Sequence, residues 1–311
     1  MPDDRGSRCT VDDAFDHGAK PSGIEWPTLL LAIGIYAAWL LITAFHASVP
    51  FWLLGVVGGV IIAWHGSLQH EIIHGHPTAT KWFNGMLGVV PLSLWLPFSI
   101  YHRSHLAHHR AEHITHPLDD PESHYVSHDH GWRARFATWE GGLIARLILG
   151  PPIRIMAFLL DETERAWRHP LDWPRDWVPH MLALWPILWW LNHVNLPITD
   201  YVLAFVYPGT ALTLLRSFAE HRADADAGRR AAIVRRGGVF GLLFLNNNLH
   251  AVHHARPDLP WYRLPDHLLQ NEQIFAAAPV YASYADVIRR FAWTPNDGIV
   301  HPAFRGQEDW V

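Results

Sequence analysis

Histidine is abundant in this chain, and much of it lies in three tight clusters. The chain of 311 residues contains 24 histidines. Within each cluster the histidines are spaced three or four residues apart, and on a helix such residues share one face. Each cluster should therefore present two or three imidazoles in one direction, and neutral imidazole is a common metal ligand. The clustered histidines are His70, His74, His105, His108, His109, His250, His253 and His254.

The three clusters together predict a site for two metal ions. A single ion takes about four to six ligands, so eight converging imidazoles exceed what one ion binds. His221, in the stretch LLRSFAEHR, is predicted to be a ninth ligand. Asn246 and Asn247 precede His250 by about one turn and could hold a metal-bound water or cap a helix.

Acidic side chains near the clusters are expected to orient the imidazoles, because a metal-bound histidine usually donates its other N–H to a carboxylate or carbonyl. The candidates are Glu71, Glu112, Asp119, Asp120, Glu122 and Glu220. Other histidines in the polar central loop are predicted to be solvated, namely His113, His116, His124, His128 and His130.

The first cluster also contains H-E-I-I-H at residues 70–74, which matches the signature of zinc metalloproteases. In that interpretation His70 and His74 bind one zinc and Glu71 is the base, with Asp119 or Asp120 as a third ligand. The extended form of the motif fails further along the chain, and the other two clusters would have no role. A site that uses all three clusters is therefore favoured.

Four long apolar runs must position these clusters. Each is close to the length that crosses about 30 Å of hydrocarbon as a helix. The runs pair into two hairpins whose short connectors lack Lys and Arg, whereas arginine is frequent between and after the hairpins. The positive-inside rule then places the connectors outside and all three clusters on the cytoplasmic side. The predicted spans are Leu29–Phe45, Trp52–Leu68, Trp177–Leu191 and Tyr201–Leu215.

Two further apolar segments are predicted not to cross the membrane. If residues 85–100 crossed, the first two clusters would lie on opposite faces, so this segment is expected to be interfacial or re-entrant. Residues 142–160 are interrupted by Pro151 and Pro152, and they are predicted to form a pair of amphipathic helices on the membrane surface. A metal transporter would need polar residues along a path inside the spans, and few are present.

These elements predict an all-α polytopic membrane protein with two transmembrane hairpins and a cytoplasmic, histidine-rich helical cap. Residues 1–25 are expected to be a flexible cytoplasmic tail, residues 26–270 the membrane domain and residues 271–311 a cytoplasmic C-terminal segment. Cys9 is the only cysteine, which excludes an intrachain disulfide and a cysteine-ligated iron–sulfur cluster. The net charge of −5 gives no support for a nucleic-acid partner.

The order of the clusters, and their placement after the second and fourth apolar runs, resemble the membrane fatty acid desaturase superfamily. That superfamily also includes membrane hydroxylases and carotenoid ketolases, and the resemblance covers about residues 27–270. It implies that the eight clustered histidines hold two irons, with His221 similar to an extra ligand found between the second and third clusters. The first cluster reads H-E where acyl desaturases often have H-D, and Ser217 stands where some animal members have asparagine, so the reaction outcome stays open.

The resemblance implies an O₂-dependent di-iron oxidoreductase that inserts a double bond into an apolar lipid or acyl chain. A hydroxylase or ketolase of a lipid or terpenoid is the alternative at the same site, and an intramembrane zinc metalloprotease is a distant one. No dinucleotide-binding, haem or iron–sulfur motif is present, so electrons should come from a separate ferredoxin- or rubredoxin-type carrier and its reductase. The expected location is a bacterial inner membrane, with the active site on the cytoplasmic face.

Overall fold

The computed structural model describes residues 23–305, and it is mostly helical. Most of the predicted N-terminal tail, including Cys9, and the last residues of the C-terminal segment lie outside the described residues. Within the described part, Glu25 is buried and its carboxylate accepts a hydrogen bond from His76 Nδ1 at 2.7 Å. The expectation of an all-α polytopic fold is confirmed, with one small sheet added.

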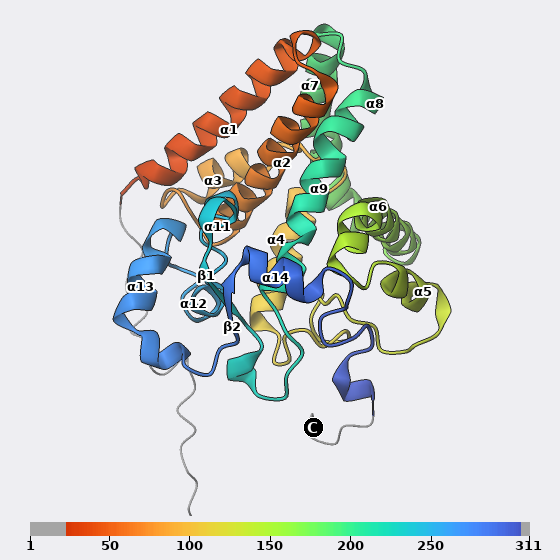
Figure 1. Ribbon diagram of the computed structural model, residues 1–311. Helices are drawn as coiled ribbons and strands as arrows, with labels where there is room; N and C mark the ends of the chain where they lie inside the picture. Colours follow the sequence, from red (N-terminus) through yellow and green to blue (C-terminus); the bar gives the residue numbers. More distant parts are fainter. Residues whose placement is uncertain (1–22, 306–311) are drawn as a thin grey trace, which may run out of the picture.

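Two helical hairpins stand side by side, with both turns at the same end of the molecule (Figure 1). One core contains buried residues from both hairpins, among them Ile35, Ile61, Ile187 and Phe205. The first hairpin is α1 (Trp26–Ala44) and α2 (Phe51–Ile73). The second is α7 (Trp173–His193), followed by α8 (Ile198–Tyr201), the π-helical turn η3 (Val202–Val206), α9 (Tyr207–Leu214) and α10 (Arg216–Ala219).

Four helical segments in the described part are long and apolar enough to cross a membrane, and three of them match predicted spans. These are α1, α2 and the continuous segment Ile198–Ala219. The fourth is α6 (Leu143–Arg168) rather than α7, which was predicted as the third span. Arg175, Asp176 and His180 make α7 more polar, yet its Trp190 donates a hydrogen bond to Thr43 of α1 at 2.9 Å, so α7 completes the bundle.

The prediction of two amphipathic helices at residues 142–160 was wrong about their number. Helix α6 is a single helix that contains both Pro151 and Pro152. Two prolines remove two N–H donors from the helix, which usually ends or kinks it. Contacts on both sides of the prolines hold α6 together here. Arg146 donates to Ser217 Oγ at 2.9 Å, and Arg154 pairs with the buried Glu140.

The segment at residues 85–100 is not one continuous helix, and it is not among the described helices long enough to span a membrane. Helix α3 (Lys81–Gly88) ends inside it, and α4 (Phe98–Arg110) begins near its end. Both histidine clusters that flank the segment can therefore lie on one side of the molecule.

Below the bundle, shorter elements form a cap around the ends of α2 and α10 (Figure 1). Strands β1 (Ile233–Arg236) and β2 (Val280–Ser283) pair in parallel, with Val234 opposite Tyr281. The other cap helices are α5 (Gly131–Trp139), α11 (Gly238–Leu243), α12 (His250–Ala255), α13 (Leu264–Gln270) and α14 (Tyr284–Phe291). Single turns of 3-10 helix occur at His46–Ser48, Ala227–Arg229, Trp261–Arg263, Glu272–Phe275 and Pro302–Phe304.

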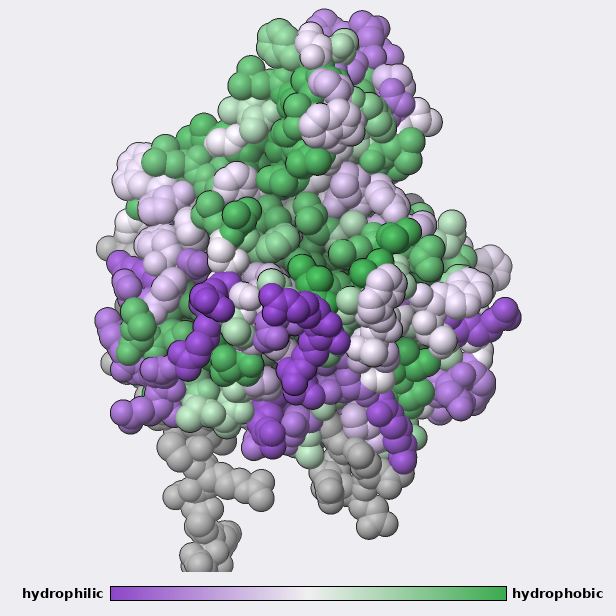
Figure 2. All heavy atoms as spheres, viewed as in Figure 1, coloured by the Kyte–Doolittle hydropathy of each residue, from purple (hydrophilic) through white to green (hydrophobic). Residues whose placement is uncertain are grey.

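The apolar and polar parts of the surface correspond to the bundle and the cap. In Figure 2 apolar residues cover much of the bundle, and polar residues gather over the cap and again at the hairpin turns. Exposed side chains on the bundle include Leu30, Ile33, Val56 and Leu182, which a water-soluble protein would bury. The four apolar helices and this surface identify an integral membrane protein.

Candidate metal centre

All nine histidines predicted as ligands converge into two adjacent groups at the junction of bundle and cap. In each group every residue offers one ligand atom, and these atoms all lie within 4.8 Å of one another. The first group, hereafter group one, is His70, His74, His105, His109 and His253. The second, group two, is His108, His221, His250 and His254.

Helical spacing explains how two short helices serve both groups. On α4, His105 and His109 are four residues apart and point to group one, while His108 points to group two. On α12 the division is reversed, because His250 and His254 enter group two and His253 enters group one. The rings of His109 and His254 stack with centroids 4.3 Å apart, so the two groups are neighbours.

The remaining ligand candidates come from the ends of the bundle. His70 lies in the last turn of α2, and His74 is the residue that caps its C-terminus. His221 follows α10, where its backbone pairs with Ala231 in an isolated bridge. The ends of the bundle thus supply three of the nine imidazoles, and helices α4 and α12 supply six.

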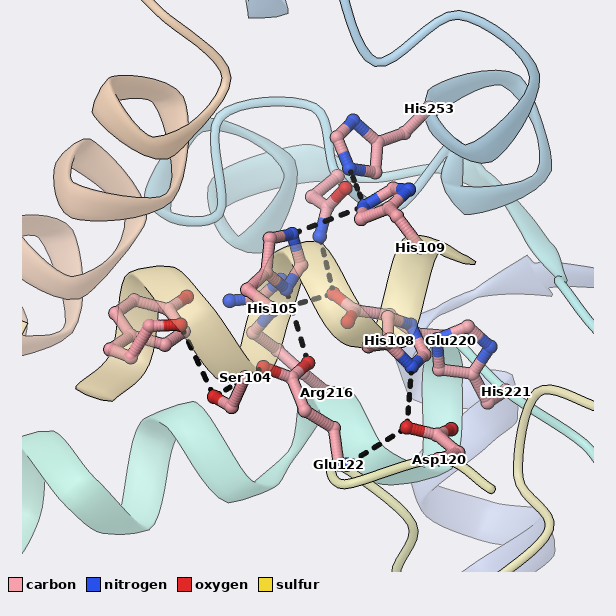
Figure 3. Close-up of polar contacts among 12 residues, drawn as sticks. Ser104, His105, His108, His109, Asp120, Glu122, Arg216, Glu220, His221 and His253 are labelled. Atoms are coloured by element: carbon pink, nitrogen blue, oxygen red, sulfur yellow. Dashed lines mark hydrogen bonds and ion pairs between the residues drawn. The ribbon is translucent and has the colours of Figure 1, made fainter. Parts of the chain in front are cut away.

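The outer nitrogens of four histidines are held by acceptors outside the two groups. His105 Nδ1 lies 3.1 Å from Glu122 Oε2, and His108 Nδ1 lies 2.8 Å from Asp120 Oδ1 (Figure 3). His250 Nδ1 lies 3.1 Å from Asn247 Oδ1, and His221 Nδ1 lies 3.3 Å from the carbonyl oxygen of Arg230. These acceptors place the proton on Nδ1, so each Nε2 turns an unshared electron pair toward the centre.

Within each group the inner Nε2 atoms lie about as close together as hydrogen-bonded atoms. If each carries an unshared electron pair and no proton, these atoms would repel one another unless a cation lay between them. In group one His105 Nε2 is 3.0 Å from His74 Nε2 and 3.1 Å from His109 Nε2. In group two the Nε2 atoms of His250 and His221 are 2.8 Å apart. Two nitrogens about 2.1 Å from one ion and at right angles would be roughly 3 Å apart, so these separations fit a shared cation in each group.

A buried nitrogen without a partner also fits a metal at group one. His70 Nε2 is inaccessible to solvent and has no hydrogen-bond partner among the described residues. Leaving such an atom unpaired costs about 1–3 kcal/mol, and a metal bond would remove that cost. Both groups therefore suit a metal ion that prefers imidazole.

Burial favours the protonation state that binds metal. Burial first, and then the neighbouring imidazoles, hold the pKa values of His250, His253 and His254 well below the usual range for histidine. Burial lowers the pKa of His109 to about 2. These imidazoles are neutral at physiological pH, as metal ligation requires.

The predicted carboxylate partners divide into those that meet the histidines and those that do not. Asp120 and Glu122 do so directly. Asn247 links Glu220 to His250, because its Nδ2 donates to Glu220 Oε1 at 3.1 Å and its Oδ1 lies beside His250 Nδ1. Asn247 therefore supports a histidine and does not cap a helix. Asp119 instead accepts from the backbone N–H of His113, and the exposed Glu112 makes no such contact.

Glu71 has a different partner from the one that the H-E-I-I-H motif suggests. Its Oε2 accepts a hydrogen bond from the backbone N–H of Trp261 at 3.0 Å, and its Oε1 is 3.9 Å from His70 Nδ1. His70 and His74 are joined by three other histidines rather than by Asp119 or Asp120. The arrangement around Glu71 therefore differs from a single-zinc protease site.

Two residues that were not predicted also reach the site. The largely buried side chain of Arg216 lies beside group two, and its Nε donates to Glu220 Oε1 at 2.6 Å (Figure 3). Tyr101 packs its ring 5.9 Å from that of His105. Each lies four residues before its partner, so helical spacing could have indicated both contacts.

An apolar cavity lies next to the histidine groups. It has a volume of about 190 Å³ and is lined by residues such as Ile62, Trp95, Leu96 and Leu214. A polar cavity of about 320 Å³ adjoins it and is lined by His105, His108, His221 and His250. Tyr101, Arg154, Thr213, Leu214 and Arg216 line both cavities. An apolar molecule that enters between the helices could thus approach the two groups.

Comparison with known proteins gives two matches. Residues 47–285, which include all nine histidines, match the family model described as Fatty acid desaturase. The chain is also 27% identical over 248 residues to the "Beta-carotene ketolase" of Paracoccus sp. (strain N81106 / MBIC 01143). That alignment covers 76% of this chain and 86% of the ketolase.

Proposed function

The chain belongs to the fatty acid desaturase family, and we propose that its two histidine groups hold a di-iron centre that oxidises a C–H bond of an apolar substrate dissolved in the membrane. The observation that carries this proposal is the convergence of nine imidazole nitrogens in two adjacent groups. Imidazole also suits zinc, copper and nickel, so the choice of iron rests on the family.

Two irons bound there would supply the activation of O₂ and the removal of hydrogen from an unactivated carbon. The protein has three tasks around them. Asp120, Glu122 and Asn247 fix the orientation of three imidazoles, and the carbonyl of Arg230 fixes a fourth. The buried walls exclude bulk water, and the apolar cavity holds the reacting carbon near the two groups.

For the reaction itself, we propose oxygen insertion into a carotenoid-like terpenoid, leading to an alcohol or a ketone. This was the alternative to acyl desaturation from the sequence alone, and the similarity to a β-carotene ketolase over most of that protein's length now favours it. The H-E form of the first histidine cluster supports the same choice. Acyl desaturation is the second candidate, because the family carries that name.

The electron source and the membrane orientation complete the proposal. A separate iron–sulfur or rubredoxin-type carrier, reduced by its own reductase, delivers two electrons for each oxygen atom inserted. The cap and its histidines face the cytoplasm of a bacterial inner membrane, because the hairpin turns lack Lys and Arg and the cap is rich in arginine.

The direct test is expression in a bacterial host that accumulates β-carotene, followed by mass spectrometry of its carotenoids and acyl lipids. Formation of an alcohol adds one oxygen atom to the carotenoid, and formation of a ketone adds one oxygen atom and removes two hydrogens. Desaturation instead removes two hydrogens from an acyl chain and adds no oxygen. We expect oxygenated carotenoid with the wild-type chain and none with His253→Ala. A new acyl double bond with unchanged carotenoids would support the second candidate, and no change in either pool would contradict both.

A further inference from the structure

His124 lies where three cavities adjoin, beside group two. A surface groove of about 440 Å³ has the exposed His128 and His130 at its edge. An enclosed cavity of about 30 Å³ reaches His221, and the polar cavity described above reaches His108, His221 and His250. Ser123 and His124 line all three cavities. A route from the surface groove to group two therefore passes Ser123 and His124.

Buried polar atoms along this route have no protein partner in the described part of the chain. They are His124 Nδ1, Asn296 Oδ1, Glu140 Oε2 and Arg154 Nε. Asn296 lines the enclosed cavity, and Glu140 and Arg154 line the surface groove. Buried polar atoms of this kind are normally satisfied by ordered water, and a polar cavity of this size can hold it.

Positive and negative side chains along the route balance one another, so the route does not repel a proton. Arg146 and Arg154 are cationic, but Glu140 pairs with Arg154, and the carboxylates of Asp120 and Glu122 line the same cavities. The guanidinium of Arg146 donates to Ser217 Oγ, and Ser217 lines both the enclosed and the polar cavity.

We propose that His124 relays protons, through water held in these cavities, from the aqueous surface to group two. The proposal rests on the proposed function, since insertion of one oxygen atom converts R–H, O₂, two electrons and two protons into R–OH and one water. The carrier supplies the electrons, and the protons must cross the buried shell around the histidines.

His124 suits this role because it is not held by any partner at Nδ1 among the described residues. Burial, together with the charges of Arg154 and Arg146, keeps its pKa well below the usual range, so the ring is neutral. A neutral imidazole carries one N–H and one acceptor nitrogen. It can accept a proton on one side, release a proton on the other and return by rotation or exchange with water.

The first experiment measures turnover of the iron-loaded enzyme in lipid nanodiscs with His124→Ala, His124→Gln and the control His169→Ala, whose histidine is exposed at the C-terminal end of α6. We expect both His124 variants to keep the metal content of the wild type and to lose turnover by at least about tenfold. Added imidazole should restore turnover of His124→Ala, because it can occupy the space of the missing ring. Unchanged turnover, or a loss that imidazole does not relieve, would overturn the relay.

The second experiment needs no activity. In a Cys9→Ser background, Ser217→Cys should react with a small water-soluble thiol reagent, because Ser217 lies at the inner end of the route. Adding His124→Phe should block the junction and abolish the reaction, whereas His169→Ala should leave it unchanged. A Ser217→Cys variant whose new thiol resists the reagent, or reacts equally with His124→Phe present, would overturn the path. A wild-type enzyme that makes no oxygenated product would count against the proposed function alone, since this second readout still tests the route.

Discussion

Carboxylates and amides outside the two groups decide which nitrogen of each histidine faces inward. Glu122 holds His105 Nδ1 and Asp120 holds His108 Nδ1, and both histidines lie on the same helix. An imidazole held in this way is already oriented and in the ligating tautomer, which strengthens metal binding. The affinity of each group should therefore depend on residues that never touch the metal.

Glu122→Ala tests this dependence. It removes the acceptor for His105, so we expect the affinity for metal to fall by roughly 10- to 100-fold. Glu112→Ala is the matched control, because Glu112 is exposed and meets none of the nine histidines. The measurement is the metal retained by each purified variant against increasing chelator. Equal retention by the two variants would show that Glu122 has no such role.

For individual residues, the sequence predicts the histidines of the two groups better than it predicts the side chains that hold their outer nitrogens. Positions three and four apart on a helix reveal which imidazoles share a face, and the eight histidines with that spacing converge as predicted. His221 joins them although no such spacing indicates it. Asn247 contacts Glu220 as well as His250, and Glu220 lies 27 residues away in the chain, so no local pattern encodes this contact. The expectation that His124 is solvated was wrong for its Nδ1, which is inaccessible to solvent.

Among the elements, α2 and α9 control the spacing of the site, because α2 ends in His70 and α9 leads to Glu220 and His221. Their backbones approach closely through small residues. A Cβ atom added at Gly209 would lie 2.4 Å from Ile62 Cβ, and one added at Gly59 would lie 2.9 Å from Pro208 Cβ. Small residues at such crossings are how membrane helices gain van der Waals contact.

Gly209→Ala should therefore force α2 and α9 apart. We expect a loss of roughly 1–3 kcal/mol in the free energy of unfolding, as for other overpacked contacts, and weaker metal retention. Gly55→Ala is the control within α2, since a Cβ there meets nothing within 4 Å and alanine favours a helix. Thermal unfolding in detergent compares the two. An equal midpoint for both variants would contradict the close contact.

The sequence also predicted most elements, and its misses have a physical cause. Hydropathy ranks α6 above α7 as a span, because most charged residues of α6 lie in its last third and leave a long apolar stretch before them. In α7 polar residues occur at both ends, at Arg175, Asp176, His180, Asn192 and His193. Pairing into hairpins identified α7 as the partner of the following span. The continuity of α6 through Pro151 and Pro152 depends on contacts with Glu140 and Ser217, so its local sequence could not predict it.

For the whole molecule, apolar residues cover much of the bundle and polar residues gather over the cap (Figure 2). The two histidine groups lie at the junction of these two parts. A substrate dissolved in the bilayer and protons from water would then reach the histidine groups from different sides. The apolar cavity beside Trp95 and Leu96 would serve the substrate, and the groove beside His128 and His130 would serve protons.

This arrangement predicts a topology that thiol labelling of intact cells can test. In a Cys9→Ser background, Ser48→Cys in the turn between α1 and α2 should react with an impermeant reagent added outside. Ala227→Cys, in an exposed turn of the cap, should react only after the cells are permeabilised. The reverse pattern would put the histidine groups on the opposite face of the membrane.

The most direct test of the central claim is the metal content of the purified protein. If both histidine groups bind iron, the wild-type chain should hold two irons. His221→Ala, which removes a member of group two, should lower the content toward one, and His169→Ala should leave it at two. A single zinc per chain with no iron would contradict the account.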